Sequence, residues 1–223
     1  MNSFKKLLWN NKGFIALMAG MLFFRSAIAD WYVVPSSSMY PTLLIGDHVM
    51  ANRLAYDVKL PFTDVILKHN ADPERGDIVT FTSPADGKRL VKRLVAVPGD
   101  VVEMQDEKLI INGQALSYQA VQSQTALTPG YPGRQVVLTE NLLGRDHAII
   151  QMPERRSIRS FGPVKVPQGQ FLMLGDNRDN SQDSRYIGFV KRELITGHVT
   201  RVLYSLDEEH YYVPRLNRFA FAL

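Results

Sequence analysis

Three consecutive serines, Ser36, Ser37 and Ser38, stand between Pro35 and Pro41 in the stretch "PSSSMYP". A serine hydroxyl can act as a nucleophile, but it is inert until a nearby base takes its proton. The two prolines fix their own φ angles and so reduce the conformational freedom of the hydroxyls between them. Backbone N–H groups in such a turn could also face an oxyanion. Because a run of serines is more often a turn or a linker, the chemistry depends on finding a base elsewhere in the chain.

The strongest candidate base is Lys92, in the stretch "RLVKRLVAV". In a β-strand, alternation places Lys92 on one face with Leu90 and Leu94, while Arg93 shares the other face with valines. Arg93 cannot lose its proton and requires a carboxylate partner. Lysine has an ordinary pKa of about 10.4, and desolvation by apolar neighbours can lower it until the neutral amine is available. A lysine that snorkels from the strand or forms a salt bridge is the alternative interpretation.

Histidine is the other possible base, and spacing alone leaves a Ser-His-Asp triad open because triad members are scattered along a chain. Each of the five histidines is more often a surface or structural residue; they are His48, His69, His147, His198 and His210.

A polar loop, "GDNRDNSQDSR" at residues 175–185, follows the apolar "FLML". A calcium loop of the usual pattern needs a central glycine and a terminal glutamate, and neither is present here. A loop with many mutually satisfiable polar groups is suited instead to brace a catalytic site.

Taken together, these motifs resemble the bacterial type I signal peptidase (leader peptidase) family, which uses a Ser-Lys dyad. The resemblance rests on separated motifs that occur in the family's order, and it covers most of residues 33–203. The motifs are "PSSSMYPTL", "RGDIVTF", "VKRLVAVPGD" and "GDNRDNSQDSR".

The resemblance implies a membrane-bound serine endopeptidase that removes N-terminal signal peptides from exported preproteins. Ser38 would be the nucleophile, neutral Lys92 the general base, and the Ser36 hydroxyl an oxyanion donor beside the Ser38 N–H. The preprotein would bind as an extended strand, with small side chains one and three residues before the cut. The resemblance implies no cofactor and no metal.

It also implies supporting roles for three residues of the polar loop. Ser181 would hydrogen-bond to Lys92 and orient it, and Asp183 and Arg185 would brace the site as an ion pair, with Arg93 nearby. Ser37 would be mainly a spacer.

The elements that must position these residues are predicted to be β-strands. Short apolar runs rich in Val, Ile and Tyr alternate with turn signals such as Pro98-Gly99-Asp100, and "KLIINGQAL" predicts a hairpin around Asn112-Gly113. We therefore expect a mainly β fold, an antiparallel catalytic body of the signal-peptidase type with an N-terminal transmembrane helix. The region at about 104–163 is predicted to be an inserted lobe.

Composition limits the other functions. The chain has 223 residues, 45% of them hydrophobic, with a net charge of +4 and no cysteine. Disulfides, thiol catalysis and cysteine-ligated metals are excluded, and no basic run interleaved with aromatic residues points to nucleic acid.

The N-terminus is predicted to attach the protein to a membrane. Residues 13–24 are wholly apolar and follow Lys5, Lys6 and Lys12. Twelve residues span only about 18 Å as a helix against about 30 Å of hydrocarbon, so we expect a helix extended to about residue 34. The expected order is a cytoplasmic segment (1–12), an anchor (13–34) and a periplasmic catalytic domain (35–223), single-pass in the inner membrane. A secretory signal cleaved after Ala29 is the alternative.

Two other functions remain open at this point. One is a specialised processing peptidase of a conjugative transfer or secretion system, and the other is a non-catalytic, membrane-tethered binding protein. A self-cleaving repressor of the LexA type would require an N-terminal DNA-binding helix pair, where this chain has an apolar segment.

Overall fold

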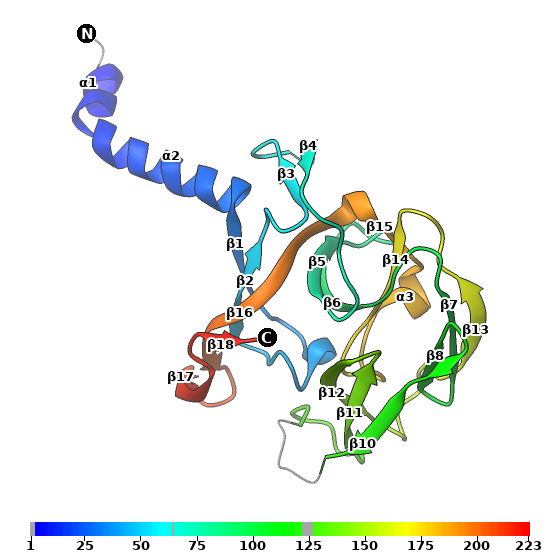
Figure 1. Cartoon of the computed structure of the whole chain (residues 1–223). Helices are drawn as coiled ribbons and strands as arrows, with labels where there is room; N and C mark the ends of the chain where they lie inside the picture. Colours follow the sequence, from blue (N-terminus) through cyan, green and yellow to red (C-terminus); the bar gives the residue numbers. More distant parts are fainter. Residues whose placement is uncertain (1–2, 64, 122–126) are drawn as a thin grey trace.

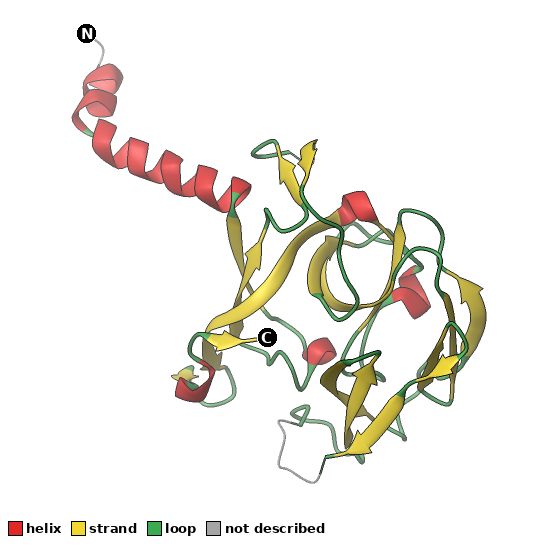
Figure 2. Cartoon of the chain, viewed as in Figure 1, coloured by secondary structure: helices red, strands yellow, loops and turns green. Residues whose placement is uncertain are grey.

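The computed structural model describes residues 3–63, 65–121 and 127–223, and its architecture is mainly β (Figure 1). Figure 2 shows strands throughout the body, where the helical segments are short turns, and two longer helices at the N-terminus. Every pairing between named strands in these ranges is antiparallel. The predicted mainly β, antiparallel class is confirmed.

One large sheet carries the strand on which Lys92 lies. Its strands, in spatial order, are β1 (Ala29–Val33), β2 (Asp47–Asn52), β16 (Ile195–Asp207), β5 (Ile78–Thr82), β6 (Arg89–Ala96), β14 (Gln170–Leu174) and β15 (Val190–Lys191). Near the C-terminus, β17 (Val213–Pro214) and β18 (Phe221–Ala222) also pair with β16, which Figure 1 shows as a long curved ribbon. The sheet thus places β6 between β5 and β14, with β1 at its edge.

Smaller sheets complete the body. One contains β13 (Phe161–Lys165), β7 (Val101–Gln105), β8 (Lys108–Ile111) and β9 (Gln114–Ala115); another contains β10 (Ser117–Ala120), β11 (Val136–Leu142) and β12 (Arg145–Gln151); and β3 (Asp57–Lys59) pairs with β4 (Ile66–His69). The hairpin predicted at Asn112-Gly113 is confirmed: it joins β8 to β9, and both turn residues have positive φ, +52° and +79°. A type I′ turn requires this backbone, which asparagine and glycine adopt readily. Residues 104–163, the predicted inserted lobe, supply most of the first two of these sheets.

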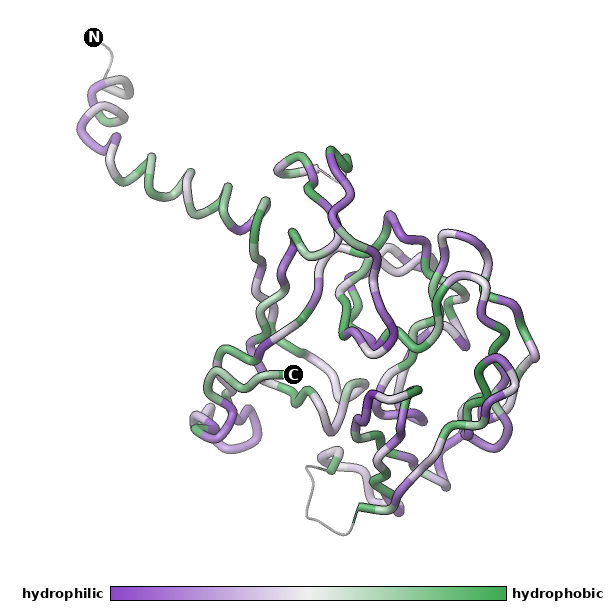
Figure 3. Tube along the Cα trace, in the orientation of Figure 1, coloured by the Kyte–Doolittle hydropathy of each residue, from purple (hydrophilic) through white to green (hydrophobic). Residues whose placement is uncertain are grey.

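The N-terminal segment forms α1 (Ser3–Asn10) and α2 (Lys12–Ala27), which project from the β body in Figure 1. The apolar side chains of α2 are exposed, and Figure 3 shows this helix as mostly hydrophobic. Among the residues that the structure describes, no helix combines the length and the apolar character needed to cross a bilayer.

The helical anchor expected to extend to residue 34 ends at Ala27, because the following residues form β1. This strand pairs with β2 over its whole length, and Asp30 is 7% exposed and forms an ion pair with Arg25 at 2.7 Å. Aromatic and β-branched residues, such as Trp31 and Val33, favour a strand at this position. Residues 29–33, which were predicted to belong to the anchor helix, therefore form the edge strand of the large sheet.

The segment that carries the predicted nucleophile, residues 34–47 (the nucleophile segment), is fixed to the body by an apolar core. Met39 and Leu43 are 1% and 0% exposed and pack in one cluster with Val34, Val49 and Val202. This burial anchors both sides of Ser38, so the serine stretch is part of the folded body rather than a linker.

Candidate active site

Ser38 and Lys92 meet at the centre of the site, although 54 positions separate them in sequence. Lys92 Nζ lies 2.6 Å from Ser38 Oγ, within hydrogen-bond distance. Ser38 sits in a single 3₁₀ turn (Ser37–Met39) that follows β1, and Lys92 points from β6. The structure thus brings together the two residues predicted to form the dyad.

The surroundings of Lys92 favour the neutral amine. Lys92 is only 3% exposed, and burial lowers the pKa of its ammonium group to about 8. The negative charges of Asp183 and Asp176 oppose this effect, since they favour the charged form, but burial outweighs them. A substantial fraction of Lys92 is therefore able to accept a proton near neutral to mildly alkaline pH.

A cavity of about 180 Å³ opens beside the dyad. Its walls come from the start of the nucleophile segment and from the first half of β6, and the lining residues include Tyr32, Val34, Ser36, Ser38, Met39, Leu90 and Lys92. Ser36 is exposed, and its Oγ lies 3.5 Å from Ser38 Oγ. The Ser36 hydroxyl is therefore close to the position where an oxyanion would form during attack by Ser38.

The polar loop at residues 175–185 holds the nucleophile segment by its backbone. The Asn177 N–H donates to the Ser38 carbonyl at 3.1 Å, and Asn177 Nδ2 donates to the Ser37 carbonyl at 3.0 Å. Asn180 Nδ2 donates to Ser37 Oγ at 2.8 Å. Ser37, which we expected to be mainly a spacer, is thus a buried anchor whose hydroxyl binds the loop.

Asp183 and Arg185 form the predicted ion pair. Arg185 Nε and Nη2 each lie 2.8 Å from a different carboxylate oxygen of Asp183, and both side chains are almost completely buried. Asp183 also accepts a hydrogen bond from the Gly175 N–H at 3.1 Å. The pair therefore fixes the start of the loop to its end.

Ser181 differs from the expected arrangement. Its Oγ is buried and makes no hydrogen bond in this structure, so the predicted contact to Lys92 is not formed. Ser181 Oγ packs instead against Gly175, where an added Cβ atom would clash with Ser181 Oγ and with the Ser38 carbonyl oxygen. Ser181 is thus packed beside the nucleophile segment, and only glycine at position 175 leaves room for this approach.

Arg93 finds its carboxylate partner in Asp176 rather than in the Asp183–Arg185 pair. The contact is bidentate, at 2.8 and 2.7 Å, and Asp176 Oδ2 also accepts a hydrogen bond from the Thr42 hydroxyl at 2.5 Å. Burial alone would raise the pKa of Asp176, but the Arg93 charge and its hydrogen bonds hold that pKa below its usual range. The ionised pair therefore connects β6, the polar loop and the nucleophile segment.

A third buried ion pair, between Arg178 of this loop and Glu140, could not be recognised in the sequence. Arg178 lies 2.5 Å from Glu140 of β11, and the side chains are 1% and 0% exposed. His147 of β12 lies 3.3 Å from the same carboxylate, and Thr128 accepts a hydrogen bond from Asn177 at 2.8 Å. The predicted inserted lobe thus contributes polar groups that support the site, although it contains no motif by which they could be recognised.

The alternative triad is not formed. In the described part of the chain, the Ser38 hydroxyl has Lys92 and Ser36 as its hydrogen-bond neighbours, and no histidine contacts it. Histidine rings are engaged elsewhere: His48 stacks on Tyr204, and His69 lies 2.8 Å from Asp57.

Several known proteins are similar to this chain in sequence. A family model described as "Signal peptidase, peptidase S26" matches residues 8–204. A signal peptidase I of Pseudomonas fluorescens is 34% identical, over 93% of this chain and 76% of the relative. One from Pseudomonas aeruginosa is 36% identical, over 78% of this chain and 61% of the relative. The solved signal peptidase I of Enterococcus faecalis V583 shares 33% identity, over 58% of this chain and 98% of that chain, with a TM-score of 0.37. These matches support neither a specialised transfer-system peptidase nor a non-catalytic binding protein.

Proposed function

The chain belongs to the signal peptidase family, peptidase S26, whose members are serine endopeptidases, and we propose that it removes N-terminal signal peptides from exported preproteins. In this proposal Ser38 is the nucleophile and neutral Lys92 is the general base. The observation that carries it is the 2.6 Å contact between Ser38 Oγ and the amine of a buried lysine.

The proposed reaction begins when Lys92 takes the Ser38 proton and Ser38 Oγ attacks the carbonyl carbon of the scissile bond. The Ser36 hydroxyl and the Ser38 N–H stabilise the resulting oxyanion. Lys92, now protonated, gives its proton to the leaving amine as the C–N bond breaks. Lys92 then activates a water molecule, which hydrolyses the acyl-enzyme and releases the signal peptide with a free carboxylate.

Two free backbone edges support binding of the substrate as an extended strand. β1 is the edge strand of the large sheet, and β14 pairs with Arg93, Leu94 and Ala96 of β6. In the described part of the chain, residues 89–92 therefore have β5 as their only strand partner. An inserted peptide can bond to these edges and direct alternate side chains into the apolar cavity beside Met39 and Leu90. The cavity is small, which favours short side chains next to the cut.

A defined preprotein tests the function. We expect the protein to cleave a preprotein with alanine one and three residues before the cut, and mass spectrometry to find a single new N-terminus. A matched preprotein with tryptophan immediately before the cut should remain intact. A general enzyme should also restore growth to cells depleted of their own signal peptidase, whereas a specialised peptidase should not. Failure to cleave the alanine preprotein would reject the proposed function.

Cleavage should depend on pH in the way that the Lys92 amine requires. Protonated Lys92 cannot accept the Ser38 proton, so kcat/KM should fall as pH decreases through the pKa of about 8 and should level off above it. The measurement is kcat/KM from pH 5 to 10 on one peptide substrate. A profile that is flat down to acid pH, or a transition near 6.5, would contradict a lysine base.

Within the same proposal, the N-terminal segment holds the catalytic body at the inner membrane as a single-pass anchor, with the body on the periplasmic side. Three features support it: the exposed apolar side chains of α2, the lysines before them, and β1, which brings the chain to Ser38 within a few residues. The lipid bilayer would then be a partner, and the cleavage sites of preproteins would emerge near the dyad. Mass spectrometry of the membrane-extracted protein decides whether the bond between Ala29 and Asp30 is cut.

A further inference from the structure

The C-terminal segment, residues 208–223, packs on the large sheet and reaches the nucleophile segment. It pairs with β16 through β17 and β18 and forms a 3₁₀ turn between them (Leu216–Arg218). Many of its apolar side chains are exposed, including Tyr211, Leu216 and Phe219. Two of its arginines face inward instead. We propose that Arg218, with Arg215 beside it, is a positioning residue that fixes the nucleophile segment so that Ser38 stays in line with Lys92. This inference rests on the proposed function.

Of the two arginines, Arg218 makes more hydrogen bonds to the nucleophile segment. Its Nε and Nη2 lie 3.0 and 2.5 Å from the two carboxylate oxygens of Asp47, and Nη2 also donates to the Thr42 carbonyl at 2.9 Å. Asp47 is 0% exposed and accepts a further hydrogen bond from the Leu44 N–H at 2.8 Å. A single guanidinium thus fixes both ends of the turn at residues 42–47.

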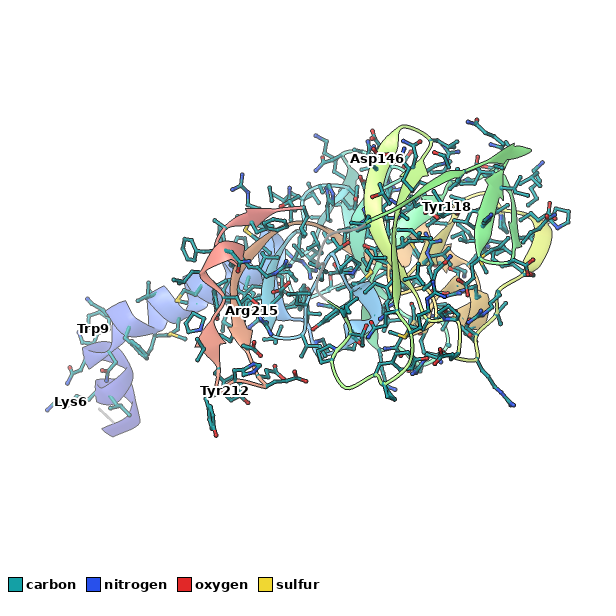
Figure 4. The ribbon with its side chains drawn as sticks, turned by 90° about the horizontal axis from the view of Figure 1, so that it is seen from below. Lys6, Trp9, Tyr118, Asp146, Tyr212 and Arg215 are labelled. Atoms are coloured by element: carbon teal, nitrogen blue, oxygen red, sulfur yellow. The ribbon has the colours of Figure 1, made fainter. Side chains whose placement is uncertain are left out.

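Arg215 supports the next part of the same turn. Its Nη1 donates to the Ile45 carbonyl at 2.9 Å and to Ser205 Oγ at 2.9 Å, and its Nη2 lies 3.1 Å from Asp207. Figure 4 shows Arg215 against the body, while Tyr212 from the same segment projects away from it. The arginines of the C-terminal segment therefore bind the turn, whereas its exposed aromatic residues do not.

Thr42 transmits this restraint toward Ser38. The Thr42 carbonyl is held by Arg218, and its hydroxyl donates to Asp176 of the polar loop at 2.5 Å. The Leu43 N–H donates to the Met39 carbonyl at 2.9 Å, which joins the turn to the residue after the nucleophile. Asn177 holds the Ser38 carbonyl from the loop side. Ser38 is thus fixed by the polar loop on one side and by the C-terminal segment on the other.

This arrangement predicts an effect on turnover rather than on substrate binding. The contacts of Arg218 lie outside the cavity beside the dyad, so its loss should not change the groove that holds the peptide. A nucleophile that is misplaced by about 1 Å can lose roughly 10²-fold in rate. Because Lys92 remains buried, its pKa should not change.

The test compares Arg218→Gln with wild type and with Arg201→Gln, a control at an exposed position of β16 opposite β18. For Arg218→Gln we expect kcat on a peptide substrate to fall about 10- to 100-fold, KM to stay within about twofold, and the apparent pKa of the pH profile to stay near 8. Arg218→Lys should recover part of kcat. The lysine ammonium can pair with Asp47, but it cannot bind both carboxylate oxygens in the geometry of the planar guanidinium. Wild-type kcat in Arg218→Gln would overturn the proposal. A loss of rate together with a raised apparent pKa would also overturn it, because it would show that Lys92 has become more exposed to solvent.

Amide hydrogen exchange gives a readout that does not depend on cleavage. The Leu43 and Leu44 N–H groups should exchange at least about tenfold faster in Arg218→Gln than in Arg201→Gln; equal rates would overturn the proposal even if wild type cleaved no preprotein. If Arg218→Gln does not fold, because it leaves the buried Asp47 carboxylate without a counter-ion, the double variant Arg218→Gln/Asp47→Asn removes that charge. It should show the same fall in kcat and the same faster exchange at Leu43, whose N–H donates to the Met39 carbonyl and not to Asp47.

Discussion

Replacement of Lys92 with methionine is expected to lower kcat/KM for preprotein cleavage by about 10³-fold or more, with little change in the melting temperature. Lys92 is 3% exposed and supplies the only amine within hydrogen-bond distance of Ser38 Oγ in the described part of the chain. Methionine has a similar length and fits an apolar site, so the loss of the base should not leave a large cavity. Steady-state kinetics on a defined preprotein, with thermal unfolding alongside, measure both quantities.

The double variant makes this prediction specific to a dyad. Ser38→Ala should cost at least as much as Lys92→Met, and Ser38→Ala/Lys92→Met should be no slower than the slower single variant, because a base without its nucleophile has no further effect. Lys88→Met is a matched control at an exposed lysine just before the same strand, and it should keep the wild-type rate. Additive losses in the double variant, or full activity in either single variant, would reject the dyad.

Those parts of the site that depend on local patterns could be predicted from the sequence. Alternation in "RLVKRLVAV" places Lys92 and Arg93 on two apolar faces of a strand, and both residues are buried, at 3% and 8% exposed. The need of Arg93 for a carboxylate is met by Asp176. The Asn112-Gly113 turn is predicted because its backbone requires positive φ. In each case, the physical requirement is visible within a few residues.

Contacts between distant segments could not be predicted in this way. Glu140 and Arg178 are separated by 38 positions. No motif in the strand that carries Glu140 marks it as the partner of a buried arginine. The N-terminal helix ends early because β2 supplies a partner for residues 29–33, and nothing within that stretch shows where its partner lies. The role of the C-terminal arginines likewise depends on Asp47, which is 171 positions before Arg218.

Glu140 provides the second prediction with a large effect, in this case on stability. Burial alone would raise the pKa of Glu140, but the charge and hydrogen bond of Arg178, with the His147 ring nearby, outweigh this effect and hold that pKa well below its usual range. Glu140→Gln would leave the Arg178 charge buried without its counter-ion. We expect the free energy of unfolding to fall by about 3–5 kcal/mol, and the melting temperature by roughly 10 °C.

Denaturant titration with three further variants tests the cause of this loss. Arg178→Met should cost a similar amount, whereas Glu140→Leu/Arg178→Met removes both charges and should recover most of the stability, since apolar pairs often replace buried ion pairs without loss. Glu193→Gln, which removes an exposed partner of Lys191, is the control and its free energy of unfolding should change little.

Because the pKa of Glu140 is lower in the folded state, its contribution to stability is present above the unfolded pKa of about 4.3 and decreases as pH falls below that value. The difference between wild type and Glu140→Gln should therefore shrink in acid; a constant difference would show that the charge of Glu140 is not what stabilises the fold.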